Sequence, residues 1–305
     1  MLLTMSILTI PEISFKDIKV KDPVAIESLS SALQEHGFVT FVEHGISSSL
    51  LEDAYNISKE FFDLPNEIKQ NYARPDTGGA RGYTQFGKET AVGETVADLK
   101  EFWHHGPDID NSYDSRIREN LPILELEEFN IICAQLFKEL HKLGLSILQS
   151  IALMLNKPEN FFDSWVEKGN SVLRLIHYPA VADESNLMRA RAHADINLIT
   201  LLVGAEESGL EVQHNDGSWI PIEAASKSIV CNIGDMMQLV TRGKLKSTIH
   251  RVVDYNTGDP KPRYSIPFFL HPSPDIMLKS IVDNSSDEVS AHDFLEERIR
   301  EIKLY

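Results

Sequence analysis

The sequence predicts an α+β fold in which a β-sandwich or jelly-roll barrel packs against one long helix. Between residues 171 and 272, short segments rich in β-branched and aromatic residues follow one another with turn signals between them, which is typical of sandwiches and barrels. Before them, apolar residues recur at three- and four-residue steps over residues 124–155, as on one face of a long helix. We expect this helix to support the sheet.

The other elements are predicted in chain order from caps, stops and periodicity. An N-terminal α/β extension is expected from a strand in "ILTIPEISF", a helix in "DPVAIESLSSALQEHG", a strand in "FVTFVEHG" and a helix in "SSSLLEDAYNISKEFFDLP". Residues 72–110 are expected to form loops and two short strands. The barrel strands are expected in "SVLRLIHYP", "INLITLLV", "GLEVQH", "SWIPIE", "SIVCNIG", "MMQLVT", "STIHRVVDY" and "RYSIPFFLHP". The segments "HNDG" and "TRGK" predict hairpin turns, and "SAHDFLEERIREIKLY" predicts a C-terminal helix.

Composition excludes several classes of function. The net charge of −17 would repel a phosphate backbone, so a nucleic-acid partner is not expected. No apolar run reaches membrane-spanning length, and the N-terminus has no basic leader with a cleavage site. Cys133 and Cys231 lie in apolar runs and predict small buried side chains of a reducing compartment. We expect a cytoplasmic protein that binds no membrane and is a monomer or weak homo-oligomer.

Two His-x-Asp pairs are candidates for chemistry. His214 and Asp216 precede a glycine between two predicted strands, which is typical of an exposed turn. His193 and Asp195 instead open an apolar strand, where residues i and i+2 point to the same face. The second pair is therefore the candidate site.

His250, in "KSTIHRVV" of another strand, supplies a third ligand. Two histidines and one carboxylate on a barrel wall match the facial triad of non-haem Fe(II) oxygenases. Zinc is the competing metal, because spacing alone does not separate the two.

Arg263 and Ser265 open the last strand and share one face. An arginine fork and a hydroxyl that point into a barrel form a receptor for a carboxylate. The alternative for a lone arginine is a surface ion pair, but here the residue adjoins the apolar "IPFFL".

Taken together, these motifs resemble the isopenicillin N synthase-like branch of the Fe(II)/2-oxoglutarate-dependent dioxygenases. The matching segments are "HADINLITLL", "CNIGDMMQLVTRGKLKSTIHRV", "RYSIPFFLHP", "GFVTFVEHGI", "EFFDLPNEIKQNY", "RGYTQFGKE" and "DLKEFWHHG". The resemblance implies a double-stranded β-helix (jelly-roll) core at about residues 168–274. It implies an N-terminal dioxygenase-type region over 1–118, and the support helix, core and C-terminal helix over 119–305, in one compact unit.

The resemblance also implies roles for single residues. His193, Asp195 and His250 would bind Fe(II), and Arg263 and Ser265 would bind the distal carboxylate of 2-oxoglutarate. Tyr178 matches a tyrosine that contacts this co-substrate. Ala194 stands where the family usually has threonine, and Ile176 where it usually has asparagine. By analogy, the candidates for the substrate wall are Tyr83, Phe86, Phe102, His104, Phe268 and His271.

The implied activity is oxidation of a C–H bond of a small metabolite by hydroxylation, desaturation or oxidative ring closure. It consumes 2-oxoglutarate and O₂ at Fe(II) and releases succinate and CO₂. Arg189 and Arg191 share parity with His193 and Asp195, which suggests that Arg191 binds an anionic, amino-acid-like substrate. For Arg189, a position in a solvated loop is favoured over a role in substrate binding.

Three other functions remain open from the sequence. An oxidase of the same fold would use no 2-oxoglutarate, and Arg263 and Ser265 would then bind a substrate carboxylate. A catalytically inactive jelly roll would serve as a binding module. A zinc hydrolase is a weaker alternative, because no general base is evident beside the triad.

Overall fold

The computed structural model describes residues 9–90, 97–180, 188–204, 209–222, 227–253 and 261–301. Within them, the largest sheet has eight strands in the order β1-β2-β10-β7-β12-β5-β4-β3. A second sheet has the order β6-β11-β8-β9, and β13 pairs with β14. The strands are β1 (Glu12–Ser14), β2 (Phe38–Val42), β3 (Gly82–Thr84), β4 (Glu101–His105), β5 (Val172–Tyr178), β6 (Met188–His193), β7 (Ile199–Val203), β8 (Leu210–Gln213), β9 (Trp219–Pro221), β10 (Ile229–Ile233), β11 (His250–Val253), β12 (Arg263–Leu270), β13 (Met277–Lys279) and β14 (Glu288–Ser290).

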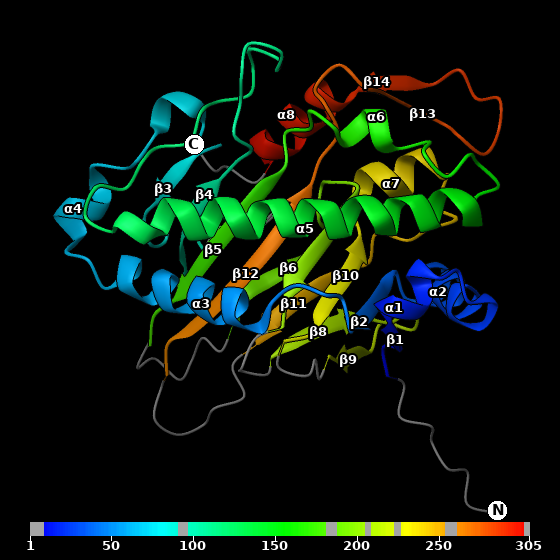
Figure 1. The fold of residues 1–305 in the computed structure, drawn as a ribbon, viewed down its shortest axis with the longest axis horizontal. Helices are drawn as coiled ribbons and strands as arrows, with labels where there is room; N and C mark the ends of the chain where they lie inside the picture. The colour runs from blue at the N-terminus through cyan, green and yellow to red at the C-terminus, as the bar shows by residue number, and fades with distance from the viewer. Residues whose placement is uncertain are drawn as a thin grey trace, which may run out of the picture.

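Helices cover one face of the large sheet, and the smaller sheet lies on its other side (Figure 1). The long helix α5 (Glu127–Met154) crosses the strands, as the sequence predicted for the support helix. The other helices are α1 (Phe15–Lys19), α2 (Pro23–Glu35), α3 (Ser48–Phe62), α4 (Asn66–Gln70), α6 (Asp163–Val166), α7 (Asp235–Val240) and α8 (Ala291–Glu301), with a 3₁₀ turn at Pro75–Thr77. The predicted jelly-roll core on a support helix, with an N-terminal extension and a C-terminal helix, is confirmed.

The alternation of side chains along the central strands separates two hydrophobic cores. On β5, Leu173 and Leu175 pack in the core beneath the helices, whereas Ile176 and Tyr178 belong to a smaller core formed with residues of the second sheet. Residues i and i+2 of a strand share a face, so Arg174 lies on the same face as Ile176 and Tyr178. The face of the large sheet that is turned away from the helices therefore carries the polar side chains of the site.

One predicted barrel strand is wrong. "MMQLVT" forms helix α7, which buries Met236, Met237 and Val240 on one side. These three residues are spaced by one, three and four positions, which places them on one face of a helix. A mostly apolar segment of only six residues is too short for this spacing to be told from that of a buried strand. "TRGK" accordingly follows a helix, with Arg242 and Gly243 at positive φ, rather than joining two strands. The turn at "HNDG" does join β8 to β9.

The ends of several predicted elements differ from their observed bounds. The first strand is shortened to β1 because Phe15 already begins α1. Residues 7–8, 91–96, 223, 254–255 and 302–305 of the predicted segments lie outside the described residues.

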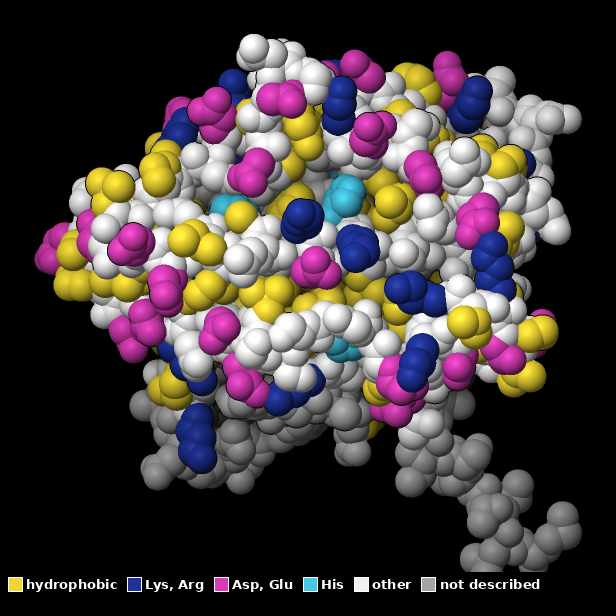
Figure 2. Space-filling model, in the orientation of Figure 1, with side chains coloured by type: hydrophobic (Ala, Val, Ile, Leu, Met, Phe, Trp, Pro, Cys, Tyr) yellow, Lys and Arg dark blue, Asp and Glu magenta, His cyan; other side chains and the backbone are white. Residues whose placement is uncertain are grey.

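The surface of the described residues mixes both signs of charge. On the face shown in Figure 2, acidic and basic side chains are interspersed, and no continuous basic stripe is visible among the described residues. Of the described helices, none combines the length and apolar character that crossing a bilayer requires.

Candidate metal centre and active site

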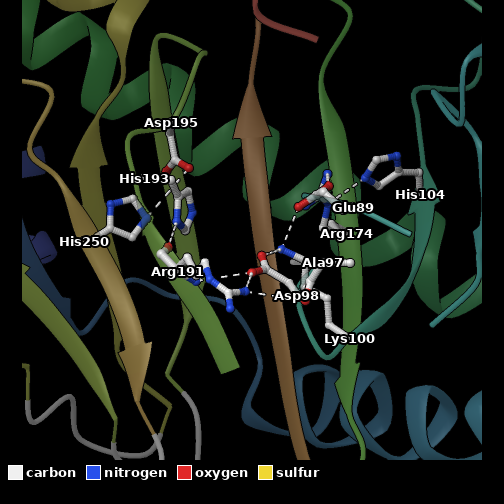
Figure 3. A network of polar contacts seen from close by, with 10 residues as sticks. All are labelled: Glu89, Ala97, Asp98, Lys100, His104, Arg174, Arg191, His193, Asp195 and His250. Atoms are coloured by element: carbon white, nitrogen blue, oxygen red, sulfur yellow. Dashed lines mark hydrogen bonds and ion pairs between the residues drawn. The ribbon is translucent and has the colours of Figure 1, made fainter. Parts of the chain in front are cut away.

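The two candidate histidine ligands meet across neighbouring strands. His193 ends β6, His250 begins β11, and the two residues are direct cross-strand partners. Their ring centroids lie 4.4 Å apart. Asp195 follows two residues after His193, and one ligand atom from each of the three residues lies within 4.8 Å of the others. Figure 3 shows the three side chains gathered at one point. The structure thus brings together the triad that the sequence suggested.

Hydrogen bonds orient each of these side chains. His193 Nδ1 lies 2.7 Å from the carbonyl oxygen of Arg191, and His250 Nδ1 lies 3.2 Å from that of Thr248. A carbonyl only accepts, so each Nδ1 donates a proton to it and Nε2 is the ring nitrogen left for a metal ion. Asp195 Oδ2 accepts from Thr200 Oγ1 at 2.6 Å and from Asn232 Nδ2 at 2.8 Å, which leaves Oδ1 available.

The protonation of the triad suits a metal cation. Burial, together with the neighbouring His250, lowers the pKa of His193 to about 4, so its ring is neutral at physiological pH. Burial acts to raise the pKa of Asp195, but the two histidines and its hydrogen bonds outweigh burial and hold that pKa below its usual range. Two imidazoles and one carboxylate on one side leave the opposite side open, which is the donor set of Fe(II) oxygenases.

A second polar site begins β12. Arg263 is 3% exposed, and its Nε and Nη1 have no hydrogen-bond partner among the described residues. Ser265 lies on the same face, and the ring centroid of Tyr178, the cross-strand partner of Arg263, is 5.7 Å from the guanidinium carbon. Buried donors without partners are costly. A bound carboxylate would satisfy them, so these residues fit the distal carboxylate of 2-oxoglutarate.

A cavity of about 670 Å³ reaches the triad, and His193 and Asp195 form part of its wall. Of the side chains suggested for the substrate wall, His104 and His271 line this cavity. Burial lowers the pKa of His271 to about 4 and the pKa of His104 well below its usual value, in the latter case with help from the charge of Arg174. Both rings are therefore neutral.

The other suggested residues lie elsewhere. Tyr83 is buried and donates to Glu101, and Phe268 packs edge-to-face on Phe137 at 5.0 Å. Phe102 lies beneath Arg174, and Phe86 is 45% exposed. Phe269 lines the cavity instead of Phe268, because it shares the parity of the inward-facing Arg263 and Ser265.

Arg191 is held by neighbouring acidic and carbonyl groups. Its Nη1 lies 3.5 Å from Asp98 Oδ1 and 3.5 Å from the carbonyl oxygen of Ala97. Figure 3 shows Arg191 between the triad and Asp98. Arg189 donates to the carbonyl oxygen of Lys261.

A buried ion network beside the cavity was not predicted from the sequence. Lys100 Nζ lies 2.6 Å from Glu89 Oε1 and 2.9 Å from Asp98 Oδ2. Arg174 Nη2 lies 3.2 Å from Glu89 Oε2. Arg174 was detectable from the sequence, because it interrupts the apolar strand "SVLRLIHYP". The pairing of Glu89 with Lys100 was not detectable from the sequence, because no local pattern brings these two residues together.

Comparison with known proteins agrees with this geometry. The model of the 2OG-Fe(II) oxygenase superfamily matches residues 169–272, and that of the non-haem dioxygenase N-terminal region, described for morphine synthesis, matches residues 10–122. The 2-oxoglutarate-dependent dioxygenase frbA of Dothideomycetidae sp. (strain 11243) is 31% identical over 90% of this chain and 89% of its own length.

Solved structures show the same similarity. A 2OG-Fe(II) oxygenase family protein from Caulobacter crescentus is 40% identical, with a TM-score of 0.87 over 96% of this chain and 99% of its own. A full-length protein from Neurospora crassa, solved in complex with alpha-KG and thymine, is 26% identical, with a TM-score of 0.85 over 98% of both chains. With the His-Asp-His cluster and the unpartnered arginine, these matches show that the chain belongs to the 2OG-Fe(II) oxygenase superfamily and is a dioxygenase that uses Fe(II), 2-oxoglutarate and O₂.

Proposed function

We propose that this dioxygenase oxidises a C–H bond of a small polar molecule by hydroxylation, desaturation or oxidative ring closure. In this proposal His193, Asp195 and His250 bind Fe(II), while Arg263 and Ser265 bind 2-oxoglutarate, which Tyr178 also contacts. The observation that carries the proposal is the buried Arg263, whose Nε and Nη1 lack partners among the described residues. An oxidase without 2-oxoglutarate would leave these donors to be satisfied by its substrate.

The residues of the chain act by holding and orienting. Bound Fe(II), with 2-oxoglutarate as the source of two electrons, supplies the oxidising chemistry. Asn232 and Thr200 fix the carboxylate of Asp195, and backbone carbonyls fix both histidine rings. Such supporting contacts set ligand orientation and metal affinity.

The test is succinate formation by the purified protein. Protein loaded with Fe(II) and 2-oxoglutarate without oxygen should form succinate once O₂ is added, because oxidative decarboxylation of 2-oxoglutarate to succinate and CO₂ requires only Fe(II) and O₂. The variant His250→Ala removes one proposed metal ligand and should lose about 95% or more of this rate. The control variant His214→Ala, in the exposed turn, should retain the rate. Wild-type protein that forms no succinate, or an active His250→Ala variant, would contradict the proposal.

We further propose that the protein acts in the cytoplasm as a monomer or weak homo-oligomer and binds neither nucleic acid nor membrane. Its net charge of −17 supports the last two points, and two free buried cysteines support a reducing compartment. Light scattering after size exclusion tests the oligomeric state, and cell fractionation tests the location.

Residues 1–118 and 119–305 are proposed to fold as one compact unit. Strands β1–β4 of the first segment lie in the same sheet as β5, β7, β10 and β12 of the second, which supports this proposal. A single unfolding transition is expected in calorimetry, and two separate transitions would contradict it.

A further inference from the structure

One wall of the cavity is formed by alternate residues of two paired strands. Asn170, Val172 and Arg174 line the cavity from β5 and the residues just before it, and Phe269 and His271 line it from β12 and the residue just after it. Val172 and Phe269 are direct cross-strand partners. This wall therefore presents a compact set of polar groups around a small apolar centre.

The same cavity is also lined by Arg81, a charged side chain that forms no ion pair with a described carboxylate. Arg81 is fully buried, and its guanidinium donates to the carbonyl oxygens of Ala80 (2.6 Å) and Arg118 (3.1 Å) and to Asn170 Oδ1 (3.1 Å). All three acceptors are uncharged, and no described carboxylate forms an ion pair with it. Burial lowers the pKa of Arg81 to about 10, so the group still carries its charge at neutral pH. A buried unpaired charge is destabilising, and an anion in the adjoining cavity would offset it.

Arg81 also fixes the amide of Asn170. A guanidinium has only donors, so the amide oxygen must face Arg81, as observed. The Nδ2 group then points away from Arg81. Because Asn170 lines the cavity and is half-buried, this amide is a fixed hydrogen-bond donor for a bound molecule.

Arg174 supplies a second, rigid donor. Its guanidinium carbon lies 4.1 Å from the ring centroid of Phe102, and its Nε donates to His104 Nε2 at 2.6 Å. Glu89 pairs with its outer nitrogens, but Glu89 is shared with Lys100, which also binds Asp98. These two carboxylates pair with Lys100, Arg174 and Arg191. Arg81, in contrast, forms no ion pair with a described carboxylate.

We infer that this end of the cavity, defined by Asn170, Arg174 and Arg81, binds a carboxylate of the primary substrate. Asn170 Nδ2 and Arg174 donate to the carboxylate, and Arg81 is a positioning residue that orients Asn170 and supplies the balancing charge. The inference rests on the proposed function and moves the expected anion site from Arg191 to Asn170 and Arg174. At this wall the buried Arg81, which has no described carboxylate partner, contacts Asn170.

The first test measures binding to the protein loaded with Fe(II) and saturating 2-oxoglutarate, kept free of oxygen. Calorimetric titration uses a panel of aliphatic and phenyl-substituted monocarboxylic acids, each paired with its primary amide. A charge-assisted bond to a partly buried anion should make at least one acid bind about tenfold more tightly than its amide. If no acid in the panel binds more tightly than its amide, the inference is overturned.

The second test uses the isosteric variant Asn170→Asp. It places a carboxylate beside Arg81, so the melting temperature should be unchanged or higher. The acid should nevertheless lose its preference over the amide, because the donor has become an anion. Retained preference in Asn170→Asp would overturn the inference.

Arg174→Gln should also reduce acid binding about tenfold. Its matched control is Arg242→Gln, which removes the same charge from an exposed residue paired with Asp283 and outside the cavity wall. An equal loss in Arg242→Gln would show a general charge effect and contradict the site. Succinate formation without any panel compound separates the two proposals. Its absence from wild-type protein would contradict the dioxygenase assignment, whereas its presence with no acid preference contradicts only the carboxylate site.

Discussion

Asn232 on β10 donates a 2.8 Å hydrogen bond to Oδ2 of Asp195, which follows β6. The bond links the large sheet to the smaller sheet at the point where the three candidate metal ligands meet. Thr200 on β7 donates to the same oxygen at 2.6 Å. The orientation of this carboxylate therefore depends on two strands that supply no ligand themselves.

Removing either donor should weaken metal binding while all three ligands remain. The variants Asn232→Leu and Thr200→Val should each raise the Kd for Fe(II) about 10- to 100-fold, measured by titration without oxygen. Thr241→Val is the matched control, because it removes a buried threonine hydroxyl that bonds Met237 within α7. A Kd that is equal in Thr200→Val and Thr241→Val would mean that Asp195 is oriented by other means.

Replacing Arg263 by lysine tests the co-substrate site. Lysine keeps the charge but loses the planar fork that binds a carboxylate through two nitrogens. Arg263→Lys should raise the KM for 2-oxoglutarate about tenfold or more, measured by succinate formation. Arg242→Lys should change nothing. A normal KM for 2-oxoglutarate in Arg263→Lys, with weaker binding of the primary substrate, would instead favour the oxidase alternative.

His105 should make the protein less stable in acid. Burial, with a smaller contribution from Arg81, lowers its pKa from 6.5 to about 4. In the unfolded chain His105 therefore binds a proton below pH 6.5, whereas in the folded chain it does so only below about pH 4. The free energy of unfolding consequently decreases as the pH falls from 6.5 to about 4. Between about pH 7 and 4.5, wild type should lose about 2 kcal/mol more unfolding free energy than His105→Gln. Urea denaturation at several pH values measures this, with His214→Gln as control. Parallel curves for wild type and His105→Gln would refute the assignment.

Gly106 is required by the position of Arg81. A Cβ atom at Gly106 would lie 2.1–2.3 Å from three guanidinium atoms of Arg81, and displacing this group would break its buried hydrogen bonds. Gly106→Ala should therefore lower the unfolding free energy by roughly 2–4 kcal/mol. Gly45→Ala meets no atom within 4 Å and is affected only by its φ of +84°, so about 1 kcal/mol is expected. Urea denaturation compares the two, and equal losses would mean that Arg81 moves freely.

Short-range patterns explain which parts of the site were predictable. Arg263 and Ser265 on one strand depend only on the two-residue repeat of a strand. The expectation that His193 and Asp195 open one apolar strand was wrong, because His193 ends β6 and Asp195 follows it before β7 begins at Ile199. The same repeat, applied to β12, would have selected Phe269 rather than Phe268. The substrate-wall candidates came from analogy instead.

Other parts depend on long-range folding. Arg174 meets His104 only because β4 and β5 pair with these two residues opposite each other, and Arg81 reaches Asn170 across 89 positions of the chain. No local pattern fixes such partners. Helix α7 was missed for a different reason, because its six residues are too few for the helical period to be distinguished from a strand.

The alternation along β5 and β12 has a consequence for how this enzyme can change. Leu173, Leu175 and Phe268 serve stability, while Arg174 and Phe269, one position away, face the cavity. Substitutions at the cavity-facing positions can therefore alter substrate preference with little effect on core packing. A deletion of one residue would exchange the two sets and damage both. Variation in specificity on this scaffold should consequently proceed by point substitution within these strands, while insertions and deletions are confined to the loops between them.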